Sequence, residues 1–245
     1  MQGFTVHEVS PGLEITIVRD APILPPAIEA EVECLWRSAE ERLAGVLFNG
    51  RVFSADAIAP GRVSGHFTEF RRIVAQTTRP ELFAALGLRP LAVNGIVRLA
   101  DGILIGKRSL RTAYQAGMWQ LPPAGSVDPA ALVDGGKIDL ALQLLKELAE
   151  ETGIVAARTA VGAPLCVVEH PLSHVLDIGI PIILALDAAA ALAAHAAAGN
   201  GEYDPLRVVP LPELAGTLAA LGGTLVPSAR IFLARLDLLP RAADS

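Results

Sequence analysis

The sequence has few aromatic and few charged residues. Aromatic side chains make up 4 % of its 245 residues and charged side chains 19 %, and Lys and Arg form no block. With 20 basic against 26 acidic residues the net charge is −6, a balance that disfavours binding to a nucleic-acid backbone. We therefore expect no nucleic-acid partner.

Cysteines are also scarce. Cys34 and Cys166 lie far apart, and neither belongs to a Cys-x-x-Cys pair. This spacing indicates neither a zinc cluster nor a disulfide framework. We expect both residues to be small buried apolar side chains.

A long uninterrupted hydrophobic run is missing. The most apolar stretch, residues 178–198, is interrupted by Pro181, Asp187 and His195, so we expect a buried strand followed by an alanine-rich helix rather than a membrane span. The first residues lack the basic start and apolar run of a secretory signal. We expect a cytoplasmic protein with no membrane partner.

What the sequence does contain is enough apolar surface to fold. Apolar residues make up 52 % of the chain and the mean hydropathy is +0.46, which excludes a disordered chain. The length suits one large domain or a core domain with an extension.

The pattern predicts an amino-terminal α+β extension over residues 1–88. Its expected elements are strands at 4–9 and 13–19, a helix at 28–43, a hairpin turning at Asn49-Gly50 and a short helix at 80–86 stopped by Gly87.

Residues 89–245 form the second expected domain. Its expected elements are a hairpin of 91–99 and 103–108, a loop at 115–134, a helix at 138–152 stopped by Gly153, strands at 160–169 and 175–186, a helix between Asp187 and Gly199, a strand at 206–209 and a helix after Pro227. This order predicts an α/β (α+β) fold in which a mixed sheet lies between helices.

Three glutamates crowd the end of the expected helix at 138–152. Glu147, Glu150 and Glu151 share a face by their spacing, and negative charge is unfavourable at a helix C-terminus. A divalent metal would remove this conflict, and oxygen ligands suit Mg²⁺ or Mn²⁺. The residues expected to face a core on the other side are Ile138, Leu142, Leu145 and Ala149. Alternatively, the glutamates form a solvated face with a Lys146–Glu150 pair.

The run Lys146-Glu147-Leu148-Ala149-Glu150-Glu151-Thr152-Gly153-Ile154 resembles the second half of the Nudix box, Arg-Glu-apolar-x-Glu-Glu-x-Gly-apolar, with Lys146 in place of Arg. Upstream, residues 117–128 are similar to the lead-in of that family. The lead-in of this chain contains Pro-Ala-Gly, and in this it resembles the lead-in of Nudix enzymes that cleave ADP-ribose and nucleoside diphosphate sugars. The resemblance covers about residues 90–235.

Two features depart from the family pattern. The distance from Gly125 to Lys146 exceeds the box spacing by seven residues, so we expect residues 129–137 to be a loop insertion. The first box glutamate then falls on Ile138, with Asp139 beside it. Lys146 keeps a positive charge but loses the bidentate fork of Arg.

The resemblance implies a Mg²⁺- or Mn²⁺-dependent hydrolase that cleaves a diphosphate linkage. Glu147, Glu150 and Glu151 would be metal ligands, together with the Gly125 carbonyl. The substrate would be a small-molecule nucleoside diphosphate derivative, with a sugar nucleotide or ADP-ribose favoured. The residues expected to contact it are Lys107 and Arg108, which would clamp the diphosphate, and Tyr203, which would stack on a ring.

The general base is left open among several residues. The box offers Glu151, with Glu150 beside it, and a glycine-bordered loop offers Glu202. The loop at 169–174 offers His174, Glu169 and His170. The amino-terminal extension would either cover the sugar or nucleoside end of the pocket or contribute to a homodimer interface.

Two rival hypotheses remain. Ile138 and Lys146 are compatible with a Nudix-fold binding module that has lost efficient catalysis and senses such a ligand. A Nudix enzyme acting on a nucleoside triphosphate or a coenzyme is the third alternative.

Overall fold

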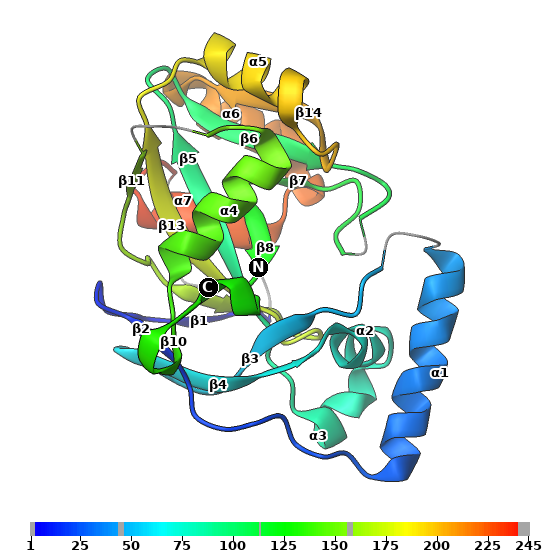
Figure 1. Cartoon of the computed structure of the whole chain (residues 1–245). Coiled ribbons are helices and arrows are strands. Elements are labelled where there is room, and N and C mark those ends of the chain that lie inside the picture. Colours follow the sequence, from blue (N-terminus) through cyan, green and yellow to red (C-terminus); the bar gives the residue numbers. More distant parts are fainter. Residues whose placement is uncertain (1–2, 44–46, 113, 156–158, 240–245) are drawn as a thin grey trace. The chain divides into compact units, whose positions relative to one another are not determined.

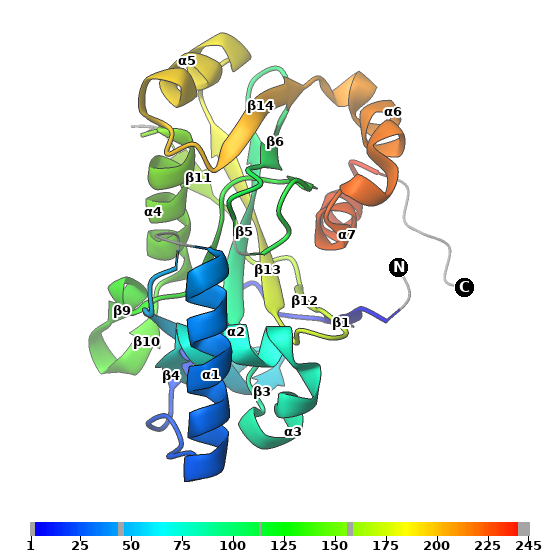
Figure 2. The ribbon, with the colours of Figure 1, turned by 90° about the vertical axis from the view of Figure 1, so that its right-hand side faces the viewer.

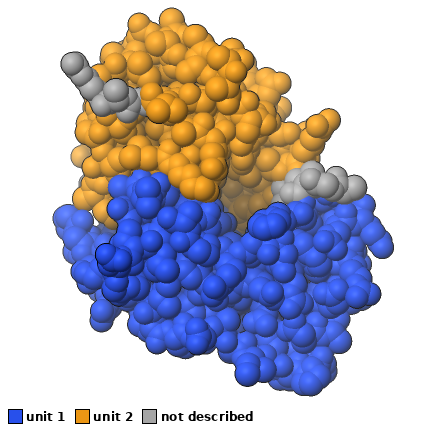
Figure 3. All heavy atoms as spheres, in the orientation of Figure 1, with its two compact units in different colours: residues 1–92, 126–143, 167–177 blue, residues 93–125, 144–166, 178–245 orange. Residues whose placement is uncertain are grey.

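The computed structural model describes residues 3–43, 47–112, 114–155 and 159–239. The chain divides into two compact units, coloured separately in Figure 3. Unit 1 comprises residues 1–92, 126–143 and 167–177, and unit 2 comprises residues 93–125, 144–166 and 178–245. Residues 126–143 and 167–177 therefore belong to the same unit as the amino-terminal part. The expected two domains, 1–88 and 89–245, remain a prediction.

Unit 1 contains a five-stranded sheet. Its order is β3 (Arg51–Ala59), β4 (Arg62–Glu69), β2 (Glu14–Ile17), β10 (Lys137–Ile138) and β9 (Leu132–Val133). β2 and β4 are parallel, whereas the other neighbours are antiparallel. β1 (Thr5–His7) pairs with β12 (Val167–Glu169) in the same unit.

The expected loop insertion at 129–137 is wrong in part, because it contributes β9 and β10 to this sheet, along with short 3₁₀ turns at Pro129–Ala131 and Asp134–Gly136. Lys137 Nζ lies 2.6 Å from Glu14 Oε1 on the neighbouring strand. The inserted residues are therefore bound into the sheet of unit 1.

The hairpin expected at Asn49-Gly50 is also wrong. Leu47 and Phe48 are not in a strand, and the β3–β4 hairpin turns at Pro60-Gly61 instead; Val46 lies outside the described residues. Asn49 has a different use, since its Oδ1 accepts a 2.9 Å hydrogen bond from the Arg71 backbone N–H.

The helices of unit 1 pack around one apolar cluster. They are α1 (Pro26–Arg42), α2 (Phe70–Thr78) and α3 (Phe83–Leu86), the last preceded by a 3₁₀ turn at Pro80–Leu82 and ended by Gly87 with φ +59°. Figure 1 shows α2 beside α1. The buried residues of the cluster are Val32, Val52, Ile73, Ala75, Leu82, Leu86 and Leu88.

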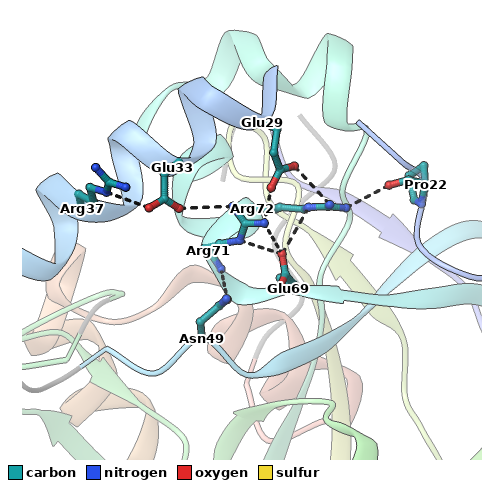
Figure 4. A network of polar contacts seen from close by, with 8 residues as sticks. All are labelled: Pro22, Glu29, Glu33, Arg37, Asn49, Glu69, Arg71 and Arg72. Carbon is teal, nitrogen blue, oxygen red and sulfur yellow. Dashed lines mark hydrogen bonds and ion pairs between the residues drawn. The ribbon is translucent and has the colours of Figure 1, made fainter. Parts of the chain in front are cut away.

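Charged side chains join α1 to α2, as Figure 4 shows. Arg71 binds Glu29 on α1 and lies 2.7 Å from Glu69 at the end of β4. Arg72 donates to the Pro22 carbonyl at 3.1 Å. Burial opposes the charge of Arg71, but its hydrogen bonds to Glu29 and Glu69 outweigh this and raise its pKa.

Unit 2 is built on strands with helices on both faces. Its strands are β6 (Ile103–Arg108), β7 (Trp119–Gln120), β11 (Thr159–Val161) and β14 (Tyr203–Val209), with most of β5 (Leu91–Arg98), β8 (Ala124–Ser126) and β13 (Leu176–Leu184). β6 pairs antiparallel with β5, β7 and β14.

In Figure 2, α4 (Leu140–Thr152) and α5 (Ala188–Ala198) lie on one side of these strands, and α6 (Leu211–Leu221) and α7 (Pro227–Arg235) on the other. A 3₁₀ turn at Gly222–Thr224 joins α6 to α7. The predicted α+β fold with a sheet between helices is confirmed, although α6 was not anticipated.

Several local predictions are confirmed. Asp187 accepts from the Ala190 N–H at 2.8 Å and begins α5, and Gly153 ends α4 with φ +70°. Cys166 is buried as expected, but Cys34 is exposed. Among the described residues, no helix combines the length and apolar character needed to cross a membrane.

Candidate functional site

The buried face of α4 differs from the expected one. Leu144, Leu148 and Glu151 are 0 %, 1 % and 2 % exposed, a set spaced by four and three residues on one side of the helix. Leu142 and Leu145, expected in the core, are 47 % and 37 % exposed. The helix therefore buries a different face from the predicted one, and this face includes the carboxylate of Glu151.

The loop after β7 lies against this side of α4. The Ala124 N–H donates a 3.0 Å hydrogen bond to Glu151 Oε2. A Cβ at Gly125 would overlap the carboxyl of Glu147, so glycine is needed for this approach. The structure thus brings together Gly125, Glu147 and Glu151, three of the residues expected at a metal site.

Glu150 is placed differently. Its side chain is 55 % exposed and lies 3.4 Å from Lys146 Nζ, which is also 3.7 Å from Glu147. The alternative i,i+4 pair is therefore present. Within the described ranges, no group of three or more His, Cys, Asp or Glu side chains is arranged to hold a metal ion.

Negative charge nevertheless crowds around Glu151. Burial raises the pKa of its carboxyl, and the charges of Glu202 and Glu147 raise it further, against the Ala124 N–H and Arg108, which lower it. A cation at this position would relieve the repulsion, and its donors would be the oxygen atoms that Mg²⁺ and Mn²⁺ prefer. The oxygen chemistry of these residues therefore suits a divalent metal, although the described side chains are not arranged as a three-ligand group.

Arg108, at the end of β6, brings a positive charge to this region. Its Nη1 lies 2.8 Å from Glu202 Oε1 and 2.9 Å from Gln120 Oε1, and its Nε donates to the Tyr114 carbonyl at 3.1 Å. The Ser109 N–H holds the Glu202 backbone oxygen at 2.7 Å. Arg108 and Glu202 are thus fixed together beside Glu151.

The other two expected substrate contacts are placed less favourably. Tyr203 is 1 % exposed and its ring packs against Gly106, an enclosed position that disfavours stacking on a ligand ring, and the stacking role stays a prediction. Burial raises the pKa of its hydroxyl. Lys107 is exposed, and strand alternation directs it to the opposite face of β6 from Arg108. A ligand contact by Lys107 stays a prediction.

The sequence analysis missed two buried polar residues that extend the hydrogen bonds of Arg108 into the interior. Gln120 and Asn94 are 5 % and 3 % exposed, and Gln120 Nε2 donates to Asn94 Oδ1 at 3.3 Å. An available signal was the position of Asn94 inside the apolar strand β5, where a buried polar group needs a partner.

His174 lies in unit 1, within a cluster of its own. Its Nδ1 is 2.9 Å from Glu169 Oε1, and its ring stacks on Phe83 with centroids 3.5 Å apart. Burial would raise the pKa of Glu169, but hydrogen bonds from His174 and His7 and the charge of Arg89 hold it below its ordinary value. These contacts supply a structural role, and a base role for His174 stays a prediction.

His170 belongs to unit 1 as well. It is 5 % exposed and its Nε2 lies 2.7 Å from Asp177 Oδ2, with the Phe4 ring edge-on at a centroid distance of 5.0 Å. The pair gives this buried histidine a polar partner, and a base role for His170 stays a prediction.

Comparisons with known proteins return solved structures alone, since no family model and no curated protein matches. A Nudix hydrolase from M. smegmatis, RenU, is 19 % identical with a TM-score of 0.42, covering 61 % of this chain and 84 % of its own. A MutT NUDIX hydrolase from Burkholderia pseudomallei is 20 % identical with a TM-score of 0.40, covering 60 % and 97 %.

A third structure is a bifunctional NMN adenylyltransferase/ADP ribose pyrophosphatase from Francisella tularensis, complexed with AMP and a Mn ion. It is 15 % identical with a TM-score of 0.41, covering 67 % of this chain and 47 % of its own. All three TM-scores lie below 0.5, so these likenesses by themselves assign neither family nor activity to the chain.

Proposed function

We propose that the chain is a metal-dependent pyrophosphohydrolase of the Nudix type, cleaving the diphosphate linkage of a sugar nucleotide or of ADP-ribose. The observation that carries the proposal is the contact of the 124–125 loop with α4. The two segments that resemble the Nudix lead-in and box meet where Ala124 binds Glu151 and Gly125 adjoins Glu147.

The metal would be held by oxygen atoms of this contact. Glu147, Glu151 and the Gly125 carbonyl are the proposed ligands, and Glu150 joins them once its side chain leaves Lys146. When bound, a divalent cation neutralises phosphate oxygens and lowers the pKa of a bound water. The crowding of carboxylates around Glu151 supports this assignment.

Arg108 supplies a positive charge for the phosphate. Its side chain is 11 % exposed, and its guanidinium already binds one anion, the Glu202 carboxylate, at 2.8 Å. A phosphate oxygen has the charge and geometry to replace that carboxylate. Glu151 and Glu202 are the two base candidates that adjoin this position.

The test is product release from a panel of ADP-ribose, UDP-glucose, GDP-mannose, a deoxynucleoside triphosphate and coenzyme A, with Mg²⁺ and with a chelator. We expect chelator-sensitive cleavage of a sugar nucleotide or ADP-ribose, and much slower cleavage of the triphosphate. Arg108→Met, compared with Arg111→Met on the neighbouring loop, should raise KM for that substrate.

Absence of turnover across the panel would refute the hydrolase. If one compound then raised the Tm without being cleaved, the result would indicate a ligand-binding module instead. Chelator-resistant cleavage would refute the metal assignment while retaining the hydrolase.

A further inference from the structure

The hydrogen bonds of Gln120 have a fixed direction. Arg108 has donors and no acceptor, so the Gln120 atom 2.9 Å from its Nη1 is the amide oxygen. The Tyr203 hydroxyl is directed at the same oxygen from 3.5 Å. The amide nitrogen of Gln120 must therefore face Asn94, to whose Oδ1 it donates at 3.3 Å.

This direction determines how the Asn94 amide is oriented. Because Oδ1 receives the hydrogen bond from Gln120, Nδ2 is turned to the other side. Nδ2 is buried and has no hydrogen-bond partner within the part of the chain that the structure describes. A buried donor without an acceptor destabilises the folded protein, so its presence calls for an explanation such as a bound water, ion or ligand.

The position of Asn94 connects it to the proposed site of cleavage. Asn94 is two hydrogen bonds from Arg108, through Gln120. The more exposed members of this network are Arg108 and Glu202, with 11 % and 23 % side-chain exposure. A ligand anion that displaces Glu202 from Arg108 would therefore bind at the exposed end of the network, and Gln120 and Asn94 would follow at its buried end.

We propose that Asn94 is a specificity-determining residue whose Nδ2 donates a hydrogen bond to an acceptor oxygen in the non-phosphate part of the ligand, a sugar hydroxyl or a base carbonyl. The inference rests on the proposed function, because it takes the ligand to be a nucleoside diphosphate derivative. Gln120 acts as the positioning residue that holds the Asn94 amide with its donor free.

The test compares binding of a whole nucleotide with binding of the phosphate part alone. UMP, AMP and inorganic pyrophosphate serve as probes in calorimetric titrations with Mg²⁺. Asn94→Ala removes the amide, whereas Asn94→Asp keeps the acceptor for Gln120 and nearly the same shape. Ser228→Ala is the matched control, since Ser228 is another buried residue of unit 2 with an unpartnered Oγ in the described chain.

We expect both Asn94 variants to bind the preferred nucleotide at least about tenfold more weakly, the loss of one hydrogen bond to a buried donor. Pyrophosphate affinity should change less than about twofold in Asn94→Ala, and Ser228→Ala should bind both probes as the wild type does. KM for the cleaved substrate should rise in the Asn94 variants with kcat less affected.

Unchanged nucleotide binding in Asn94→Ala and Asn94→Asp would overturn the inference, as would an equal loss for nucleotide and pyrophosphate. These results leave the proposed function standing, because the wild type would still cleave its substrate. A wild type that neither binds nor cleaves any nucleotide would overturn both.

Discussion

Replacing Gly125 by Ala tests the contact between the loop and α4 with a single methyl group. The backbone of Gly125 is not in the left-handed region, so alanine is allowed there on conformational grounds. The cost falls instead on Glu147, whose carboxyl carbon lies 2.2 Å and whose two carboxylate oxygens lie 2.5 Å from the position of the new Cβ.

The size of the displacement follows from contact distances. Non-bonded carbon atoms settle at about 3.5–4.0 Å, so the carboxyl carbon of Glu147 must retreat by more than about 1 Å. Glu147 can do this by rotating its flexible side chain, which costs little folding energy. A shift of about 1 Å in a catalytic group, however, can lower the rate about a hundredfold.

The assay is kcat of Gly125→Ala on the substrate identified by the panel, together with urea unfolding. We expect a loss of about a hundredfold in kcat with less than about 1 kcal/mol change in stability. Gly216→Ala is the control, because Gly216 lies within α6 with no atom near its Cβ position, and alanine there should stabilise the helix. Activity of Gly125→Ala within twofold of the wild type would refute a catalytic position for Glu147.

Four further predictions concern charge and packing. Glu150→Gln and Glu151→Gln should each lower kcat at least about a hundredfold, because each removes a metal-ligand charge. Lys146→Arg should preserve or raise activity, measured as kcat/KM. The free energy of unfolding of the wild type should fall as the pH drops below about 4.5, and in Glu169→Gln this fall should be smaller by the contribution of the Glu169 carboxylate. Urea unfolding at a series of pH values measures both. Leu144→Ala should cost about 2–5 kcal/mol in the same assay, since Leu144 is fully buried.

The pH prediction follows from the sign of the shift. The pKa of Glu169 is below its ordinary value of 4.5 in the folded state, so its ionised form contributes stability above that value. The contribution is lost as pH falls through the lower, folded-state pKa. An identical pH dependence in the wild type and in Glu169→Gln would contradict this account, and Glu213→Gln on the surface helix α6 is the control.

Contrary results are equally specific for the other variants. Wild-type turnover in both Glu150→Gln and Glu151→Gln would exclude them as metal ligands. A large loss in Lys146→Arg would show that the site has adapted to lysine. A stability change below about 1 kcal/mol in Leu144→Ala would contradict its place in the core.

The sequence predicted most of the fold where local chemistry decides it. Asp187 and Gly199 bound α5 because a cap and a stop need few distant contacts. The hairpin predicted at Asn49-Gly50 was wrong because a turn dipeptide does not determine whether the segments on both sides of it pair as strands. Asn49 instead satisfies a backbone N–H at the start of α2.

The metal-site prediction depended on the face of α4 that is buried. Periodicity counted Leu142 and Leu145 as core residues because they are apolar, yet both are more than a third exposed. The buried face contains Glu151, which no hydrophobicity pattern assigns to an interior. The motif located the glutamates, while the packing around Leu144 and Leu148 decided which of them is enclosed.

Distant pairing accounts for what the sequence left out. Arg108, Gln120 and Glu202 come from three separate segments, and their contacts follow from the β6–β7 and β6–β14 pairings. No spacing within one segment reveals such a network. The strand β10 likewise depends on pairing with β2, more than a hundred residues earlier in the chain, and β9 in turn pairs with β10.

The most direct test of the account is a calorimetric titration of Mn²⁺ into the full chain and into Glu147→Gln, Glu151→Gln and Glu213→Gln. We expect saturable binding in the wild type and in Glu213→Gln, and at least about tenfold weaker binding in the two α4 variants. Equal Mn²⁺ affinity in all four proteins would contradict a metal site between α4 and the 124–125 loop.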